Sequence, residues 1–387
     1  MRYDRAGSLD TRVREAFAVW KKLDETDVRI LEGLSLLGAR NLAKIARYLH
    51  LPASTVTYRV RKMLSNSILF LRLNPYHTNM GLKKVLPFVE AAPGREDDLL
   101  DCLRVNDFWI FLCRIYGPYE GCGGVWTIPK NNAEEFQSFI ESLIDAGVAR
   151  SAELIWSTCF QGIPVKSRWF NSDNCVWTFN WDEWINEVET IEGELPYTLI
   201  EPEDWPIKAD YEDLLIIKEL EKDARTSMRN ISKAVGVPLS TIKYHYREHV
   251  LKRDIIEDYQ LELYRFPFPL SEIIFFKFEF DDYERMAKFA LSLLDKPLAI
   301  YLGKVLGENA LVSQMYLLKW EFRRFVHALT NLIKKGLLKD YHYFIQDMYQ
   351  TWKETIPYEH FENGRWNYNY EKQKEELKKV LHKKGVI

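Results

Sequence analysis

The sequence predicts an α+β protein in which one unit, three helices followed by a βαββαβ module, is present twice in tandem. Three observations predict this class. A helical stretch with a basic outer face at residues 52–64 recurs at residues 238–250. The segments after each copy are typical of strand, helix, strand, strand, helix and strand in that order. The 387 residues, 47% of them hydrophobic, are enough for two to four domains.

The two copies can be aligned residue by residue, which indicates an internal duplication. Phe136 and Trp177 match Phe325 and Trp366 at an offset of 189 positions, so the unit covers roughly half the chain. At an offset of 186 positions, the following residues recur as the same type: Asp27, Ile30, Leu34, Ile45, Pro52, Ser54, Thr55, Tyr58 and Arg61 match Asp213, Ile216, Leu220, Ile231, Pro238, Ser240, Thr241, Tyr244 and Arg247.

Three helical segments open each unit. In the first copy, residues 24–38 and 41–49 carry apolar stripes at helical spacing, and a short turn leads to a third helix. Pro52 and Pro238 end the preceding helix, and the Ser and Thr after each favour a new N-terminus. Helix, tight turn and helix predict a helix-turn-helix, and the alternating residues that follow add a strand and a wing. The resulting winged helix-turn-helix domains span residues 23–81 and 210–268.

The second part of each unit predicts a ferredoxin-like sheet with helices on one face. Residues 132–147, for example, form an amphipathic helix that Gly147 ends. The two ferredoxin-like domains are predicted at residues 82–159 and 269–348. The remaining segments are a predicted N-terminal helix at 1–22, an aromatic and acidic extension and linker at 160–209, and a C-terminal extension and helix at 349–387.

Charged residues are segregated along the chain, although the formal net charge is only −3. Residues 33–89 contain no Asp or Glu and nine Lys or Arg. Residues 224–253 contain seven Lys or Arg and a single acid, Glu248, whereas residues 182–223 are strongly acidic. Two cationic segments on an acidic body are typical of a protein that binds a polyanion. Both segments coincide with a predicted helix-turn-helix.

Several classes of protein are disfavoured by the sequence. No apolar run approaches the ~18–20 residues needed to span a bilayer, so no membrane partner is expected. The N-terminal stretch has no apolar signal segment, which predicts a cytoplasmic protein. The five cysteines form no CxxC pair, so we expect neither disulfides nor a zinc framework, and no cofactor.

Residues 51–63 read LPASTVTYRVRKM. This stretch, together with a winged helix-turn-helix followed by a βαββαβ module, resembles the Lrp/AsnC family of transcription regulators, whose recognition helix follows L-S-x-x-T-V-x-x-R-I-x-R-L. Leu23-Asp24, or alternatively Asp27, matches the family's leucine-aspartate pair before the first helix, and Asn74-Pro75 and Met80-Gly81-Leu82 resemble the exit from the wing into the sheet. The resemblance implies a sequence-specific regulator of double-stranded DNA that is not an enzyme. It also allows a small-molecule effector at the ferredoxin-like domains and a homodimer through the sheet domains.

The duplication predicts one polypeptide that carries what relatives assemble from two subunits. The two recognition helices differ in sequence, because Thr57 corresponds to Lys243 and Arg59 to His245. We therefore expect two DNA half-sites that are not identical. If both helices bind one face of a duplex, they are expected to lie roughly 34 Å apart or a multiple of that distance.

The outer faces of the two recognition helices supply the candidate DNA contacts. Base edges are read by side chains with donors and acceptors, and phosphates by Lys and Arg. The residues predicted to contact bases are Ser54, Thr57, Tyr58, Arg61, Ser240, Lys243, Tyr244 and Arg247. Those predicted to contact phosphates are Lys44, Arg47, Lys62 and Arg229. Thr55, Arg59, Thr241 and His245 complete the DNA-binding set. The alternative is a pair of ordinary solvated helices.

Residues 245–249, HYREH, match H-x-x-E-H, a zinc-peptidase pattern in which two His bind the metal and Glu is the base. The corresponding residues 59–63, RVRKM, have no metal chemistry. The motif also lies on the helix that is predicted to read DNA. We therefore expect the match to be a coincidence, with no metal site and no catalytic residue.

An enzyme of the same architecture is the rival interpretation. Siroheme decarboxylases resemble Lrp/AsnC proteins and can be fused pairs. Their characteristic His-Asn-Tyr segment is expected near the middle strands of the module. Residues 107–126 and 296–312 contain no His, so we favour the regulator and keep a tetrapyrrole enzyme as the alternative.

Overall fold

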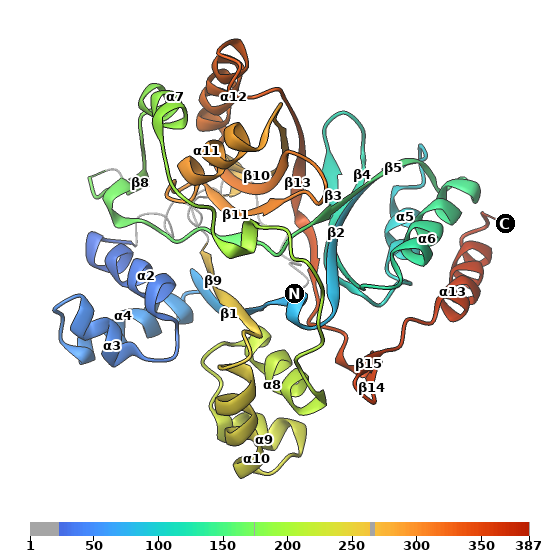
Figure 1. Ribbon diagram of the computed structural model, residues 1–387, viewed down its shortest axis with the longest axis horizontal. Coiled ribbons are helices and arrows are strands. Elements are labelled where there is room, and N and C mark those ends of the chain that lie inside the picture. The colour runs from blue at the N-terminus through green and yellow to red at the C-terminus, as the bar shows by residue number, and fades with distance from the viewer. Residues whose placement is uncertain (1–22, 174, 264–267, 387) are drawn as a thin grey trace.

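A computed structural model describes residues 23–173, 175–263 and 268–386 and contains two winged helix-turn-helix domains and two ferredoxin-like modules (Figure 1). The fold class predicted from the sequence is confirmed. The helix expected at 1–22 lies outside the described residues. In the part of the chain that the structure describes, no helix is long and apolar enough to cross a bilayer. The five cysteines are all free thiols.

Each winged helix-turn-helix domain has three helices and one long wing strand. Val28, Ile45 and Val56 are fully buried, as their helical spacing predicts. The first domain consists of α2 (Glu25–Leu37), α3 (Leu42–Tyr48), α4 (Ala53–Ser65) and β1 (Leu69–Pro75). The second consists of α8 (Tyr211–Lys222), α9 (Met228–Val235), α10 (Leu239–Tyr244), the π-helical segment η4 (His245–Val250) and β9 (Ile256–Leu263).

The first helix of each domain begins with the same capping box. In α2 the side chain of Asp24 accepts a hydrogen bond from the backbone N–H of Asp27 at 2.9 Å, and the side chain of Asp27 accepts one from the backbone N–H of Asp24 at 3.3 Å. In α8 the same two bonds join Asp210 and Asp213, each at 3.0 Å. The boxes therefore fix two carboxylates at the N-terminus of each first helix.

The two domains are joined through their wings. β1 pairs antiparallel with β9, from Leu69 opposite Leu263 onward. Arg40 adds a second link, because its Nη1 donates to the carbonyl oxygens of Ala224 at 2.6 Å and Thr226 at 3.0 Å. These contacts hold the two domains beside each other at one end of the molecule (Figure 1).

Both modules have the strand order of a ferredoxin-like sheet, fourth-first-third-second. The first contains β2 (Leu82–Ala91), α5 (Glu96–Leu103), β3 (Trp109–Tyr116), β4 (Gly121–Pro129), α6 (Ala133–Asp145) and β5 (Ala149–Ser157). The second contains β10 (Ser271–Glu279), α11 (Tyr283–Leu293), β11 (Ala299–Lys304), β12 (Ala310–Leu318), α12 (Lys319–Lys334) and β13 (Asp340–Lys353). Short 3-10 turns lie at η1 (His77–Asn79), η2 (Ser167–Trp169), η3 (Tyr197–Leu199), η5 (Phe268–Leu270) and η6 (Tyr358–His360).

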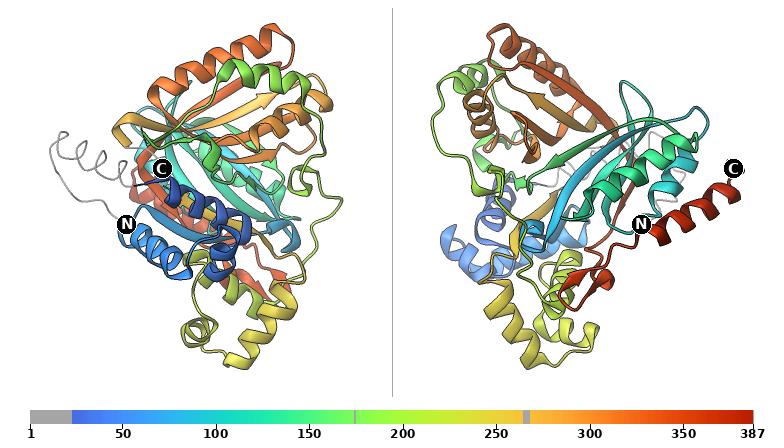
Figure 2. Two further views of the ribbon diagram at one scale, coloured as in Figure 1. Left: turned by 90° about the vertical axis from the view of Figure 1, so that its left-hand side faces the viewer. Right: turned by 45° about the vertical axis from the view of Figure 1, so that its right-hand side comes forward.

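The two modules share one nine-stranded sheet. β3 pairs with β13, and β6 (Gln161–Gly162), which follows β5, pairs with β11. The inner faces of both modules contribute to one apolar cluster. Within it, the rings of Phe88 and Phe344 stack with their centroids 4.9 Å apart. The helices of each module cover the outer faces (Figure 2), so the two modules pair through their sheets within one chain.

The two extensions cross over between the units. α7 (Trp181–Thr190) packs on α11 and α12, whereas α13 (Tyr370–Lys383) packs on α5 and α6. Trp184 anchors the first contact: it is buried, its ring lies 5.6 Å from that of Phe289, and its Nε1 donates to Ser292 Oγ at 3.0 Å. Two short hairpins precede these helices, β7 (Phe170–Asn171) with β8 (Val176–Trp177) and β14 (Phe361–Glu362) with β15 (Arg365–Trp366). The extension of each unit therefore packs against the ferredoxin-like module of the other unit.

Candidate nucleic-acid interface

The first recognition helix, α4, presents a polar face to solvent. Val56 and Val60 bury the opposite face against the other helices of the domain. Tyr58 is 66% exposed, which leaves its ring free for contact with a partner. The neighbouring exposed side chains are Ser54, Arg61 and Lys62. This face combines hydrogen-bonding groups with positive charge, as base and phosphate contacts require.

The second recognition helix, formed by α10 and η4, presents a similar face. Ile242 is buried, whereas Tyr244 is 57% exposed. Ser240, Lys243 and Arg247 are exposed beside it. Among the other predicted residues, Thr55, Thr57 and Thr241 are partly buried.

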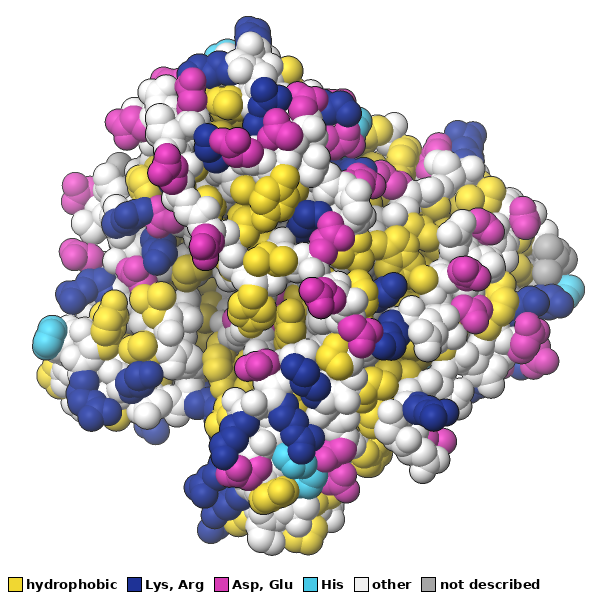
Figure 3. Space-filling model, in the orientation of Figure 1, with side chains coloured by type: hydrophobic (Ala, Val, Ile, Leu, Met, Phe, Trp, Pro, Cys, Tyr) yellow, Lys and Arg dark blue, Asp and Glu magenta, His cyan; other side chains and the backbone are white. Residues whose placement is uncertain are grey.

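The predicted phosphate contacts lie next to these helices. Lys44 and Arg47 are exposed on α3, and Arg229 is exposed on α9. Lys and Arg side chains gather on the lower left and the bottom of the molecule, over the two winged helix-turn-helix domains (Figure 3). The cationic segments of the sequence therefore form cationic surfaces in the fold.

Two of the predicted DNA contacts are turned inward. Arg59 Nη1 donates to both carboxylate oxygens of Asp24, at 2.6 and 2.7 Å, and to Asp27 Oδ1 at 2.9 Å. Burial acts to raise the pKa of Asp24, but the hydrogen bond from Arg59 and its charge outweigh burial and lower that pKa. His245 faces Asp213, with 3.0 Å between Nδ1 and Oδ1. We therefore leave Arg59 and His245 out of the proposed DNA surface, because each is held by the capping box of its first helix.

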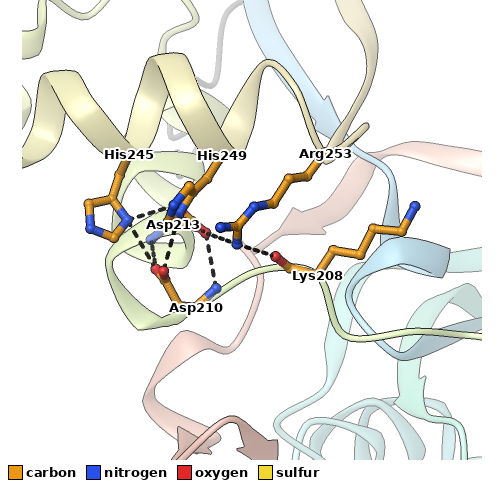
Figure 4. Close-up of polar contacts among 6 residues, drawn as sticks. All are labelled: Lys208, Asp210, Asp213, His245, His249 and Arg253. Carbon is orange, nitrogen blue, oxygen red and sulfur yellow. Dashed lines mark hydrogen bonds and ion pairs between the residues drawn. The ribbon is translucent and has the colours of Figure 1, made fainter.

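In the second domain four side chains, Asp210, Asp213, His245 and His249, meet between α8 and η4 (Figure 4). We call them the Asp/His cluster. One nitrogen or oxygen from each residue lies within 4.8 Å of those from the others. Asp213 is fully buried, and burial raises its pKa. The sequence indicated the His pair, but its Asp partners lie on another helix and meet it only through packing.

A cavity of about 670 Å³ lies between the paired wing strands and the inner strands of the modules. His77 of η1 lines it, is fully buried, and has no hydrogen-bond partner at either ring nitrogen among the described residues. Burial and the nearby Lys84 lower the pKa of His77 well below its ordinary value. The buried hydroxyl of Tyr301, which also lines the cavity, likewise has no partner in the described part of the chain. Volume and unpartnered polar atoms suit a small-molecule site.

Charged groups are buried around this cavity. Lys84 Nζ lies 3.3 Å from Glu257 Oε2, and both side chains are only 1% exposed. Burial raises the pKa of Glu257, while the positive charge of Lys84 opposes that rise. Burial also raises the pKa of Asp258 to about 6 and of Glu221 to about 8. These residues were not predicted from the sequence. Lys84 lies in the mostly apolar strand β2, but Glu257 and Asp258 lie in the polar strand β9 and Glu221 lies in helix α8, where charged residues are common.

Comparisons with known proteins identify one part of the chain. Residues 210–248 match a family model described as winged helix-turn-helix DNA-binding. The second domain is a winged helix-turn-helix DNA-binding domain. An uncharacterized HTH-type transcriptional regulator of Pyrococcus furiosus is 39% identical over 84 residues, which are 21% of this chain and 56% of that relative. The chain thus spans little more than half the length of this relative.

Two crystal structures of the siroheme decarboxylase NirDL are similar over nearly the whole chain. One has a TM-score of 0.52 at 9% identity and covers 94% of this chain and 100% of that chain. The other, a co-complex with an iron-uroporphyrin III analogue, has a TM-score of 0.51 at 7% identity and covers 95% and 99%. The structural similarity shows a shared fold, and at this sequence identity it shows nothing beyond the fold.

Proposed function

We propose that this protein is a sequence-specific transcription regulator of Lrp/AsnC type whose single chain reads two non-identical half-sites in double-stranded DNA. The observation that carries the proposal is the pairing of β1 with β9, which holds two recognition helices with exposed cationic faces in one polypeptide. A fixed pair of such helices can read two sites on one duplex, because the spacing of the half-sites then mirrors the spacing of the helices.

The two helices share some exposed side chains and differ in others. Tyr58 and Arg61 have Tyr244 and Arg247 as counterparts, and all four are exposed. Thr57, in contrast, corresponds to Lys243. Shared residues account for contacts common to both half-sites, and the difference accounts for distinct base preferences.

In vitro selection from random duplex DNA, repeated at two salt concentrations, tests this function. We expect enrichment of a bipartite site with two unlike halves, and footprinting should then protect both halves. The paired variants Arg61→Ala and Arg247→Ala should each relax selection at one half only. Binding that shows no sequence preference at either salt concentration, or a strictly palindromic selected site, would contradict the proposal.

A second candidate function is a tetrapyrrole enzyme, and the cavity beside His77 is the observation that favours it. The cavity lining contains Lys218 and Lys222, which could meet ligand carboxylates. It also contains the acids Glu221, Asp258, Glu262 and Glu354, and Glu262 pairs with both Arg72 and Lys353. Titration with an iron uroporphyrin would shift and sharpen the absorption spectrum of the ligand if it binds there. The variant His77→Ala should abolish that shift, and His342→Ala, a change at an exposed residue on β13, should leave it intact. An unchanged spectrum would exclude this candidate.

A further inference from the structure

The Asp/His cluster brings together residues from two elements that form the second reading domain. Asp210 and Asp213 belong to the start of α8, and His245 and His249 lie one turn apart on η4 (Figure 4). His245 Nδ1 lies 3.2 Å from Asp210 and 3.0 Å from Asp213. His249 Nδ1 lies 3.2 Å from Asp210 and 3.3 Å from Asp213. Each imidazole thus faces both carboxylates.

These nitrogen–oxygen separations are close to one edge length of a tetrahedral metal site. Zinc binds His nitrogen and carboxylate oxygen at about 2.0–2.1 Å, so neighbouring ligand atoms around a tetrahedral ion lie about 3.3 Å apart. The four nitrogen–oxygen separations in the cluster run from 3.0 to 3.3 Å. The two His nitrogens face different oxygens of Asp210, and the four ligand atoms lie within 4.8 Å of one another, so the side chains must draw together around an ion. His245 and His249 lie four positions apart in the π-helical segment η4, and π-helical turns occur frequently at functional sites.

The first domain shows what the same carboxylates bind when the His pair is absent. Asp24 and Asp27 occupy the positions of Asp210 and Asp213, and the guanidinium of Arg59 forms an ion pair with each of them. The second domain has His245 at the position of Arg59 and His249 at the position of Met63. Arg253 does not take over this role. It stays 4.0 Å from Asp213 and donates instead to the carbonyl oxygen of Lys208 at 3.0 Å.

The surroundings of the cluster suit a structural ion. Asp213 is buried and His245 and His249 are 14% and 11% exposed at their side chains, whereas Asp210 is 40% exposed and leaves a path for entry. The capping box holds both carboxylates in place, as outer hydrogen bonds do in many metal sites. Glu248, the base in the peptidase pattern, points away and pairs with Lys252. The geometry therefore disfavours a peptidase.

We propose that the Asp/His cluster binds one divalent transition-metal ion, Zn²⁺ being the best match, and that this ion ties the second recognition helix to α8. Two His and two Asp provide four ligands for one ion, and the two negative charges offset its charge. The first domain achieves the same tie with Arg59, so the two domains use different cations at equivalent positions.

The test uses the full chain, purified without a histidine tag and dialysed against a chelator before titration with Zn²⁺ or Co²⁺. We expect about one equivalent bound, a visible Co²⁺ absorption band of the intensity typical of tetrahedral coordination, and a melting temperature several degrees higher with metal. The double variant H245R/H249M gives the second domain the residues that the first domain has at the corresponding positions, Arg59 and Met63. It should fold, lose the Co²⁺ band and show no change in melting temperature on addition of metal.

Two further variants complete the experiment. His342→Ala removes an exposed His outside the cluster and should bind metal as the unchanged protein does. If the double variant does not fold, the single variant His249→Gln replaces it and should weaken metal binding at least tenfold. The proposal would be overturned if the unchanged protein did not bind metal stoichiometrically, or if the cluster variants bound metal equally well. The two Asp and two His would then form only hydrogen bonds and ion pairs with one another.

Discussion

Arg59 on the first recognition helix donates to Asp24 at the start of the first helix, with 2.6 Å between Nη1 and the nearer carboxylate oxygen. The contact holds the guanidinium of Arg59 against the first helix, so we propose no DNA contact for this residue. It also identifies the place where the two winged helix-turn-helix domains differ in chemistry, because His245 replaces this arginine in the second domain.

Replacement of Arg59 by Ala is expected to destabilise the protein rather than to change base preference. Asp27 is almost buried, and removal of Arg59 leaves its carboxylate without a cation, at a cost of roughly 1–3 kcal/mol in the free energy of unfolding. Arg61→Ala, two positions along on the exposed face, is the matched control and should leave the melting temperature unchanged. Thermal melts of both variants check this.

The pKa of Asp24 is lowered in the folded state. The contribution of Asp24 to the stability of the fold is therefore present above the ordinary carboxyl pKa and is lost as the pH falls below that value.

Tyr58→Ala should relax base preference at one half-site, and Tyr244→Ala at the other. Each side chain is more than half exposed on its recognition helix, so truncation removes groove contacts without opening the core. We expect a loss of about 1–3 kcal/mol of discrimination at the affected half-site. Binding to a panel of single-base variants of the selected site measures it. Tyr283→Ala, an exposed Tyr on α11, serves as the control, and an equal loss on every sequence would contradict a base-reading role.

Lys44→Ala should weaken DNA binding about equally on all sequences. Lys44 is exposed on α3 and is proposed to neutralise a phosphate, so its loss removes a counterion-release contribution. The slope of log K against log salt should fall in magnitude by about one. Affinity measured at several salt concentrations tests this, and a slope that stays unchanged would place Lys44 outside the interface.

Glu221→Gln should stabilise the protein at alkaline pH. Burial next to the cavity raises the pKa of Glu221 from 4.5 to about 8, although Arg72, Lys222 and Lys84 oppose the rise. Between these two values the folded state holds a proton that the unfolded state has lost, so stability falls as the pH rises through this window. Glutamine stays neutral and removes this part of the decline, whereas Glu257 and Asp258 retain theirs. Melting temperatures from pH 5 to 9 should therefore fall less steeply in the variant, and Glu203→Gln, at an exposed carboxylate, should match the unchanged protein.

The sequence by itself determined the local elements and their repetition. Apolar residues such as Val56 and Val60 recur at helical spacing, Pro52 and Pro238 mark helix starts, and the strand-helix order follows from hydrophobic periodicity. These are properties of neighbouring residues, so they can be read from a single chain. The exposed positions of Tyr58 and Tyr244 follow from the same periodicity.

Only the tertiary structure decided which distant segments meet. The pairing of β1 with β9, the exchange of α7 and α13 between modules, and the cavity beside His77 all depend on contacts between residues far apart in the sequence. The inward turn of Arg59 and the meeting of His249 with Asp210 arise in the same way. The periodicity of a helix predicts which side faces its neighbours, but the packing of the helices determines which residues that side contacts.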